Sequence, residues 1–128
     1  MSMAEHNELG KWGERYALDI LDREGYMLVE TDWRPPHGHG DIDIVAYTPD
    51  RTVMVFVEVK TRSREGALMP EDSVDAKKIR NIASCANRYI KQKGYDGDIR
   101  FDIISIIGSE DDIDHYEHIV DAFNPNLL

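Results

Sequence analysis

The sequence predicts an α/β protein in which a mixed β-sheet is flanked by helices. Two long segments, 8–24 and 75–93, carry apolar residues at helical spacing. Five shorter segments are rich in β-branched and aromatic residues, and turn residues such as Gly and Pro separate them. The resulting order is α-β-β-β-α-β-β. In this order the second helix can return the fourth strand parallel to the third, so the sheet contains both parallel and antiparallel pairs.

The length of 128 residues is typical of one domain, so we expect 1–128 to form a single domain. No apolar run approaches the roughly 20 residues that a membrane helix needs. The polar N-terminus, residues 1–9, does not resemble a secretory signal. Cys85 is the only cysteine, which excludes an internal disulfide and favours a buried, inert thiol. These features predict a cytoplasmic protein that does not insert into membranes.

The net charge of −10 argues against nucleic acid as a partner, because phosphate binding depends on Lys and Arg. The distribution of charge tempers this argument. Acids gather toward the two ends of the chain, whereas bases recur between Lys60 and Arg100. A basic face on an acidic protein is therefore compatible with the sequence.

The first helix is predicted over residues 8–24. Its apolar stripe consists of Leu9, Trp12, Gly13, Tyr16, Ala17, Ile20 and Leu21. Gly13 lies in this stripe although glycine costs about 1 kcal/mol in a helix relative to alanine, so we expect the helix to approach a strand closely there. Glu14 lies at the border of the stripe. It is either a solvated glutamate or a side chain that reaches the edge of the sheet.

A strand is predicted over residues 26–33, with Tyr26, Leu28 and Glu30 on one face and Met27 and Val29 on the other. The Pro- and Gly-rich segment 35–40 follows as a loop. Two histidines of this loop, His37 and His39, are a weak zinc signal without a third ligand nearby, so loop residues without a metal are the favoured interpretation.

Residues 41–47 and 52–61 are predicted to form a hairpin. If Tyr47 pairs with Thr52, Asp41 lies opposite Glu58 and Asp43 lies opposite Phe56. One face then carries Asp43, Met54, Phe56, Glu58 and Lys60, whereas the other face carries Ile42, Ile44, Ala46, Val53, Val55, Val57 and Val59. Strands that are apolar on both faces over much of their length are central in a sheet covered on both sides.

The remaining elements are a mobile loop over 65–69, a second helix from Ser73 or Asp75 to Lys93, and two further strands over 99–107 and 114–123. Gly94 is the expected C-terminal signal of the second helix. His115 and His118 are expected on an exposed face of the last strand.

Asp43, Glu58 and Lys60 form a pattern with a chemical purpose. Carboxylates on neighbouring strands supply the oxygen ligands that Mg²⁺ or Mn²⁺ prefers. A lysine two residues after the glutamate projects from the same face, where it can orient a water or stabilise developing negative charge. An ammonium among acids stays protonated, which favours this electrostatic role. The alternative is a structural salt bridge of Lys60 with Glu58 or Asp41.

Three stretches carry a resemblance to a known family: residues 10–17 (GKWGERYA), 40–46 (GDIDIVA) and 57–62 (VEVKTR). Further matches are Val74, Lys77, Arg80, Arg100, Phe101, Asp102, His118, Ile119, Ala122 and Phe123. The chain resembles the YraN-like family of small bacterial proteins, within the PD-(D/E)xK superfamily of nucleases related to Holliday junction resolvases. The resemblance implies a restriction-endonuclease-like α-β-β-β-α-β core with an added C-terminal strand.

By this resemblance the catalytic residues are Glu14, Asp43, Glu58 and Lys60, with Asp43 and Glu58 as metal ligands. Asp43 is preferred over Asp41 because it immediately precedes the Ile-Val-Ala run. The implied activity is that of an endonuclease that depends on Mg²⁺ or Mn²⁺ and hydrolyses phosphodiester bonds of DNA. Branched or structured DNA is one possible substrate.

The residues expected to bind nucleic acid are Arg62, Lys77 and Arg80, although Lys77 and Arg80 also fit a solvated helix face. Related resolvases are dimers, so a homodimer is one assembly that the resemblance implies. Two other functions stay open: a non-catalytic nucleic-acid-binding module on a nuclease fold, and a protein-interaction domain, which the charge of −10 makes plausible.

Overall fold

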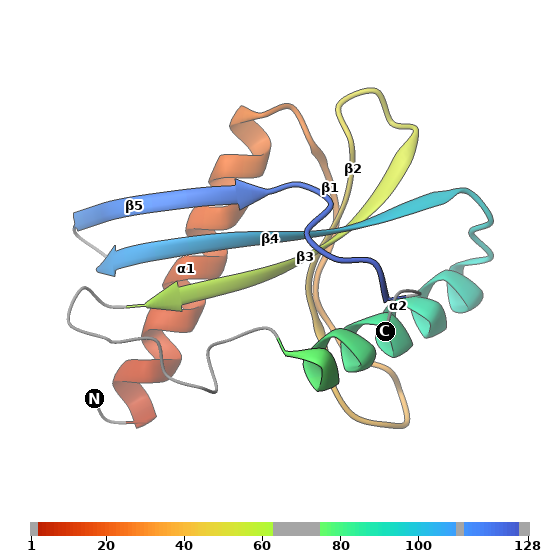
Figure 1. Ribbon diagram of the computed structural model, residues 1–128, viewed down its shortest axis with the longest axis horizontal. Coiled ribbons are helices and arrows are strands. Elements are labelled where there is room, and N and C mark those ends of the chain that lie inside the picture. Colours follow the sequence, from red (N-terminus) through yellow and green to blue (C-terminus); the bar gives the residue numbers. More distant parts are fainter. Residues whose placement is uncertain (1–2, 63–74, 110–111, 126–128) are drawn as a thin grey trace.

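Helices and strands follow one another in the predicted order in the computed structural model, which describes residues 3–62, 75–109 and 112–125 (Figure 1). The elements are α1 (Met3–Arg23), β1 (Met27–Trp33), β2 (Ile42–Tyr47), β3 (Val53–Arg62), α2 (Ala76–Lys93), β4 (Asp98–Ser109) and β5 (Asp112–Ile119). The α/β fold class is therefore confirmed. Helix α1 begins earlier than predicted, and the loop predicted over 65–69 lies outside the described residues.

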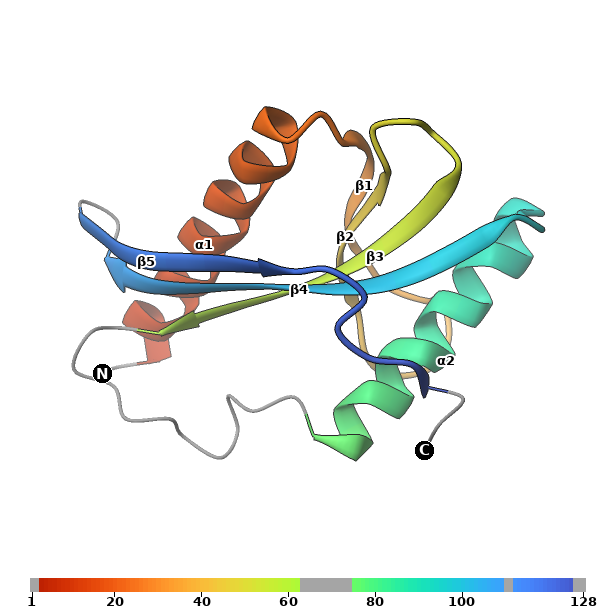
Figure 2. The ribbon, with the colours of Figure 1, turned by 45° about the horizontal axis from the view of Figure 1, so that its top comes forward.

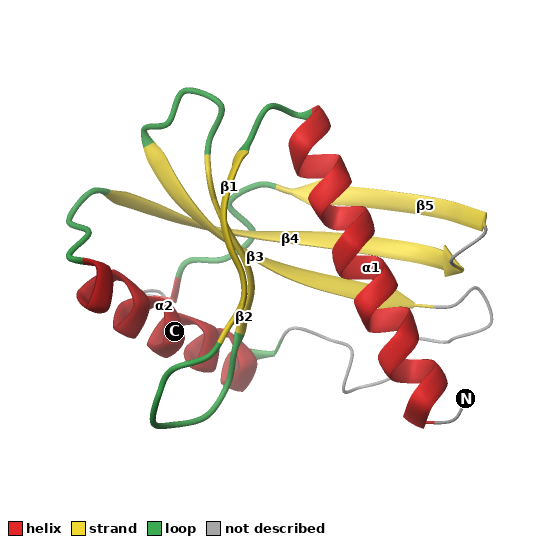
Figure 3. Ribbon diagram, turned by 180° about the vertical axis from the view of Figure 1, so that it is seen from behind, coloured by secondary structure: helices red, strands yellow, loops and turns green. Residues whose placement is uncertain are grey.

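The strands form one sheet in the order β1-β2-β3-β4-β5. Strand β4 runs parallel to β3, and the other neighbouring pairs are antiparallel. Helix α2 is thus the predicted crossover connection. The two helices lie on opposite faces of the twisted sheet (Figures 1 and 2), and α1 crosses β3, β4 and β5 when the molecule is seen from behind (Figure 3). Among the described residues, no helix is long and apolar enough to cross a bilayer.

The face under α1 is the apolar face predicted for the hairpin. Its buried cluster consists of Trp12, Ala17, Ile20, Leu21, Ile44, Ala46, Val55, Val57, Ile104 and Ile106. Gly13 is buried against β3, where a Cβ atom on it would overlap Cγ2 of Thr61. The predicted close approach of helix and strand is confirmed.

Substitution of Gly13 by alanine is expected to lower the free energy of unfolding by about 1–3 kcal/mol, because the added methyl group overpacks this contact. The matched control is Gly10→Ala on the same helix, where a Cβ meets no atom within 4 Å. There, alanine should stabilise the helix by up to about 1 kcal/mol. Thr61→Ser removes the clashing methyl group and should restore most of the stability of Gly13→Ala in urea denaturation. Equal stability of the two alanine variants would contradict the close contact.

The other face packs against α2. Its buried cluster consists of Trp33, Ile42, Val45, Met54, Phe56, Ile82, Cys85, Ala86, Tyr89 and Phe101. Asp75 caps the start of α2 by accepting a hydrogen bond from the backbone N of Lys78 at 2.9 Å. Gly94 ends α2 in the left-handed conformation, with φ of 67°. Ile42 belongs to this cluster, so its predicted place with Ile44 on the α1 face was wrong.

The register of the hairpin differs from the prediction by two residues. Tyr47 pairs with Met54 rather than with Thr52. The difference arises in the turn, where Thr48 N donates to the carbonyl of Val53 at 3.0 Å and Asp50 accepts from Thr52 N at 3.0 Å. These hydrogen bonds stabilise a loop between Tyr47 and Met54 that is longer than a tight turn. Because the shift is even, it moves no residue to the other face of the sheet by itself, but it changes the cross-strand partners.

The outer strands deviate from simple alternation. Strand β1 has a bulge between Leu28 and Glu30, so the predicted alternation of its faces was wrong, and Met27, Leu28 and Val29 are all exposed. In β5, His115 is exposed as expected. His118 is not, because its side chain is only 6% exposed and lies 2.7 Å from the buried carboxylate of Asp102.

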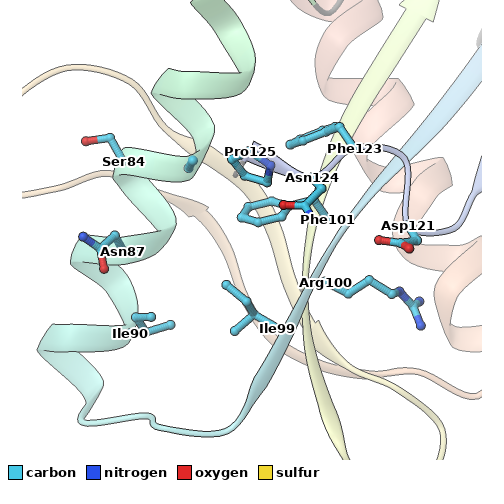
Figure 4. Close-up of a pocket in the computed structure, with 11 residues that line it drawn as sticks. Ser84, Asn87, Ile90, Ile99, Arg100, Phe101, Asp121, Phe123, Asn124 and Pro125 are labelled. Carbon is cyan, nitrogen blue, oxygen red and sulfur yellow. The ribbon is translucent and has the colours of Figure 1, made fainter. Parts of the chain in front are cut away.

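A hollow of about 680 Å³ lies between α2, the start of β4 and the segment 121–125 (Figure 4). The rings of Phe101 and Phe123 stack there with centroids 5.1 Å apart. Arg100 points away from α2 toward Asp121 (Figure 4). Asp121 is the only acidic residue in the lining described for this hollow, so it offers no pair of carboxylates for acid–base or metal chemistry.

Candidate functional site

Two carboxylates face each other across β2 and β3. The ladder runs from Tyr47–Met54 to Ile44–Val57, and one more step of this register places Asp43 opposite Glu58. Asp43 Oδ2 accepts a hydrogen bond from the backbone N of Val59 at 2.9 Å, which holds its side chain against β3. Glu58 is buried, with 8% of its side chain exposed. In the predicted register Asp43 lay opposite Phe56 and Glu58 was its diagonal neighbour, so the observed register brings the two acids closer together.

The electrostatics of this pair are unfavourable without a cation. Burial and, after it, the charge of Glu58 raise the pKa of Asp43 to about 8, against the lowering effect of the bond from Val59 N. The charges of Glu14 and Asp41 raise it further. A cluster of desolvated acids whose pKa values are shifted by one another is a candidate functional site.

Glu14 and Lys60 come to this cluster from different elements. Glu14 is half-buried on α1, and its pKa is raised by burial and by the charges of Asp32, Asp41 and Glu58, so its carboxylate lies within electrostatic reach of the pair. Lys60 follows Glu58 by two residues on β3, and its Nζ is shielded from solvent. The structure therefore gathers the acids predicted from the sequence around β2 and β3, with Lys60 on the same strand as Glu58.

The sequence reasoning missed Lys78. Its Nζ lies 2.9 Å from Oε1 of Glu58, so the basic partner of this acid is a residue of α2. Burial alone would lower the pKa of Lys78. The charge of Glu58 and the hydrogen bond to it outweigh burial, and the pKa is raised. The signal available in the sequence was a pair of lysines in the first turn of α2, where cations oppose the helix dipole and need a compensating partner.

The donor set fits a hard divalent cation. Mg²⁺ and related ions are commonly held by one or two carboxylates, with water and substrate phosphate completing the shell, and Asp43 with Glu58 provides such a pair. A closed site with three protein side chains does not fit: among the described residues, no group of three or more His, Cys, Asp or Glu side chains could hold a metal. His37 and His39 lie exposed on a loop whose carbonyls accept bonds from Arg88 and Cys85 of α2.

The metal-free protein is expected to lose stability as the pH rises toward 8. A carboxyl whose pKa is higher in the folded state than in the unfolded state stabilises the fold at low pH, and this stabilisation disappears as pH rises through the folded-state pKa. For Asp43 that window runs from 3.8 to about 8. Relative to wild type, Asp43→Asn should gain up to about 1.4 kcal/mol of unfolding free energy per pH unit in this window.

Urea denaturation in EDTA between pH 6 and 8 measures this difference. Asp96→Asn, at an exposed carboxylate after α2, provides the control for the loss of a surface acid, and its effect should not change with pH in this range. A constant difference between wild type and Asp43→Asn across this range would contradict the electrostatic description of the site.

The predicted nucleic-acid-binding residues lie on β3 and α2, the two elements that carry Glu58 and Lys78. Arg62 is half-buried at the end of β3, whereas Lys77 and Arg80 are exposed on α2. Lys77 lines a hollow of about 290 Å³ beside Asp41 and Lys78. The whole of α2 carries no acidic residue, and its bases are Lys77, Lys78, Arg80, Arg88, Lys91 and Lys93.

The element order and the sheet topology define the class: an α/β protein whose helices and strands are consistent with a nuclease-like core. The chain belongs to the uncharacterised protein family UPF0102, whose sequence model matches residues 13–106. This confirms the resemblance to YraN-like proteins.

Full-length relatives support the assignment. The chain is 43% identical over 126 residues to a UPF0102 protein of Bacteroides thetaiotaomicron, covering 98% of this chain and 100% of that protein. It is 41% identical over 127 residues to a UPF0102 protein of Porphyromonas gingivalis, covering 98% and 90% of the two chains. A UPF0102 protein of Flavobacterium psychrophilum is 39% identical over 121 residues, with 94% and 98% covered.

Proposed function

We propose that the protein is a metal-dependent endonuclease that hydrolyses phosphodiester bonds of DNA, with branched or structured DNA among the substrates to be tested. The observation that carries the proposal is the opposition of Asp43 and Glu58 on β2 and β3, with Lys60 two residues beyond Glu58. Paired carboxylates and a lysine on neighbouring strands suit phosphodiester hydrolysis, which needs a hard cation and a group that stabilises negative charge.

Each residue then has a role. Asp43 and Glu58 would hold Mg²⁺ or Mn²⁺, which would supply Lewis-acid activation of water and stabilise charge on the phosphate. Lys60 would stabilise the negative charge that develops during attack. Glu14 adds a carboxylate from α1, close enough for the charge of Glu58 to act on it.

The charge distribution supports a nucleic-acid substrate despite the net charge of −10. Helix α2, which provides the ion pair to Glu58, carries bases and no acid. Lys77 and Arg80 on α2 and Arg62 on β3 would bind phosphates that flank the scissile bond. A cation at the carboxylate cluster would further reduce the negative potential that opposes DNA.

The test is incubation of purified protein with branched, flapped, single-stranded and duplex DNA in the presence of Mg²⁺, Mn²⁺ or EDTA. We expect cleavage that requires the metal and is lost in Asp43→Ala. Absence of cleavage on every substrate, or cleavage that survives Asp43→Ala, would contradict the proposal. Salt-dependent binding without cleavage would favour a non-catalytic binding module, and absence of binding would favour a protein-interaction domain.

A further inference from the structure

Lys78 links the carboxylate cluster to solvent. It lies in the first turn of α2, and its Nζ is 2.9 Å from Oε1 of Glu58. The side chain of Glu58 is 8% exposed, whereas that of Lys78 is 43% exposed. One end of this ion pair is therefore fixed in the protein and the other end is a long side chain with access to water.

Without a divalent cation, Lys78 supplies the positive charge that Glu58 needs. An uncompensated buried carboxylate is costly, and Glu58 lies opposite a second acid, Asp43. The charges of Asp43 and Asp41 also act on Lys78, so its ammonium faces several members of the cluster. A divalent cation at Asp43 and Glu58 would provide the same compensation and would repel the ammonium.

Lys78 also borders the hollow of about 290 Å³ beside the cluster. The lining of this hollow consists of Gly40, Asp41, Asp75, Lys77, Lys78, Asn81 and Ile82. Lys77, Lys78 and Asn81 provide hydrogen-bond donors for an anionic ligand such as a phosphate group, whereas of the two acids in the lining Asp75 already accepts a bond from Lys78 N at 2.9 Å. Lys78 therefore contacts the carboxylate of Glu58 and also borders a hollow in which a substrate phosphate could bind.

We propose that Lys78 is a positioning residue that exchanges partners. It neutralises Glu58 while no divalent cation is bound, and it binds a substrate phosphate in the adjoining hollow once a cation has taken over the charge of Glu58. This inference rests on the proposed function. Its consequence is that binding of cation and binding of phosphate reinforce each other, since Lys78 can serve the phosphate only when it is released from Glu58.

The first half of the inference is tested without DNA. In calorimetric titration with Mn²⁺, Lys78→Gln should bind the cation about 10-fold more tightly than wild type, because a competing positive charge has been removed. Lys78→Arg keeps the charge and should resemble wild type. Lys77→Gln removes the same charge one residue away without the contact to Glu58 and should change the affinity less than about 3-fold. Affinity of Lys78→Gln equal to or below that of wild type would overturn the inference.

The second half is tested by the salt dependence of binding to branched DNA, with Ca²⁺ as the probe cation or with EDTA. Each phosphate contact contributes about 0.9 to the slope of log affinity against log salt. Lys78→Gln should reduce the slope by about 1 in Ca²⁺ and leave it unchanged in EDTA, whereas Lys77→Gln should reduce it equally in both. An equal reduction for Lys78→Gln in both conditions would overturn the exchange.

These outcomes separate the two proposals. A wild-type protein that binds neither cation nor DNA would refute the proposed function and, with it, the inference. A wild-type protein that binds both, with a Lys78→Gln variant that behaves like it, would refute the inference alone. Thermal unfolding of each variant verifies that the compared proteins are folded.

Discussion

Lys60→Met is expected to slow DNA cleavage by about 10²–10³-fold while divalent-cation binding and the fold are preserved. A preorganised donor that stabilises transition-state charge contributes about 2.7–4 kcal/mol to catalysis. Lys60 has this character because its Nζ is shielded from solvent and its place on β3 is fixed two residues after Glu58. Methionine keeps most of the apolar volume of the side chain and removes only the charge.

Single-turnover cleavage at saturating protein measures the chemical step, and Mn²⁺ titration measures the metal site separately. Arg62→Met, two residues further along β3, is the comparison variant. It should weaken DNA binding and lower the salt slope by about 1, because Arg62 is expected to contact phosphate rather than the reacting atoms. An unchanged cleavage rate in Lys60→Met would remove Lys60 from the catalytic set, and loss of Mn²⁺ binding would instead make it a structural partner of the carboxylates.

Local sequence rules predicted the elements of this fold well because each element has strong local signals. Helix α2 ends at Gly94 as predicted, and its start was predicted at Ser73 or Asp75, of which Asp75 is the capping residue in the structure. Gly13 was recognised as a packing contact because glycine is unfavourable at the centre of an apolar stripe. The even periodicity of the hairpin placed Asp43, Glu58 and Lys60 on one face before their partners were known.

The register of the hairpin could not be predicted in the same way. It depends on hydrogen bonds of Thr48 and Asp50 within the turn, which decide how many residues lie outside the ladder. Their effect on the site is large, because it replaces a diagonal arrangement of Asp43 and Glu58 by a direct one. Lys78 was missed for a related reason: its contact with Glu58 depends on how α2 packs on the sheet, which local periodicity does not determine.

The C-terminal strand shows the same limit. Arg100, Asp102 and His118 were noticed only as separate matches to a family pattern, and His118 was expected to be exposed. In the structure they form one network: Arg100 donates to both carboxylate oxygens of Asp102 at 2.8 Å, and His118 Nε2 lies 2.7 Å from Oδ2. The antiparallel pairing of β4 with β5 brings His118 to the buried carboxylate of Asp102, although the two residues are 16 positions apart in the sequence.

Asp102→Ala is expected to lower the free energy of unfolding by about 3–5 kcal/mol, because it leaves buried cationic groups without their counter-charge. Asp102 is fully buried and also accepts a bond from Asp121 N at 3.0 Å. Burial alone would raise the pKa of Asp102. The bonds from His118, Arg100 and Asp121 N outweigh burial and lower it, so the carboxylate is ionised wherever the protein is folded near neutral pH.

Urea denaturation at pH 7 measures this loss, and Asp98→Ala provides the matched control. Asp98 is an exposed acid on the same strand, so its removal changes the net charge equally but should alter stability by less than about 0.5 kcal/mol. Equal effects of the two substitutions would show that the network around Asp102 contributes no more than a surface charge.

The pH dependence distinguishes the two cations that share Asp102. Burial alone lowers the pKa of His118, but its bonds to Asp102 and Glu24 raise it above 6.5. A histidine with a raised folded-state pKa contributes its full stabilisation below pH 6.5 and loses it as the pH rises through the folded-state pKa.

His118→Gln should therefore be more destabilising at pH 6 than at pH 9. Asp102→Ala should remain destabilising at both, because the guanidinium of Arg100 stays charged throughout. A pH-independent loss in His118→Gln would show that His118 acts through packing on Tyr26, whose ring centroid is 5.6 Å from its own, rather than through its charge.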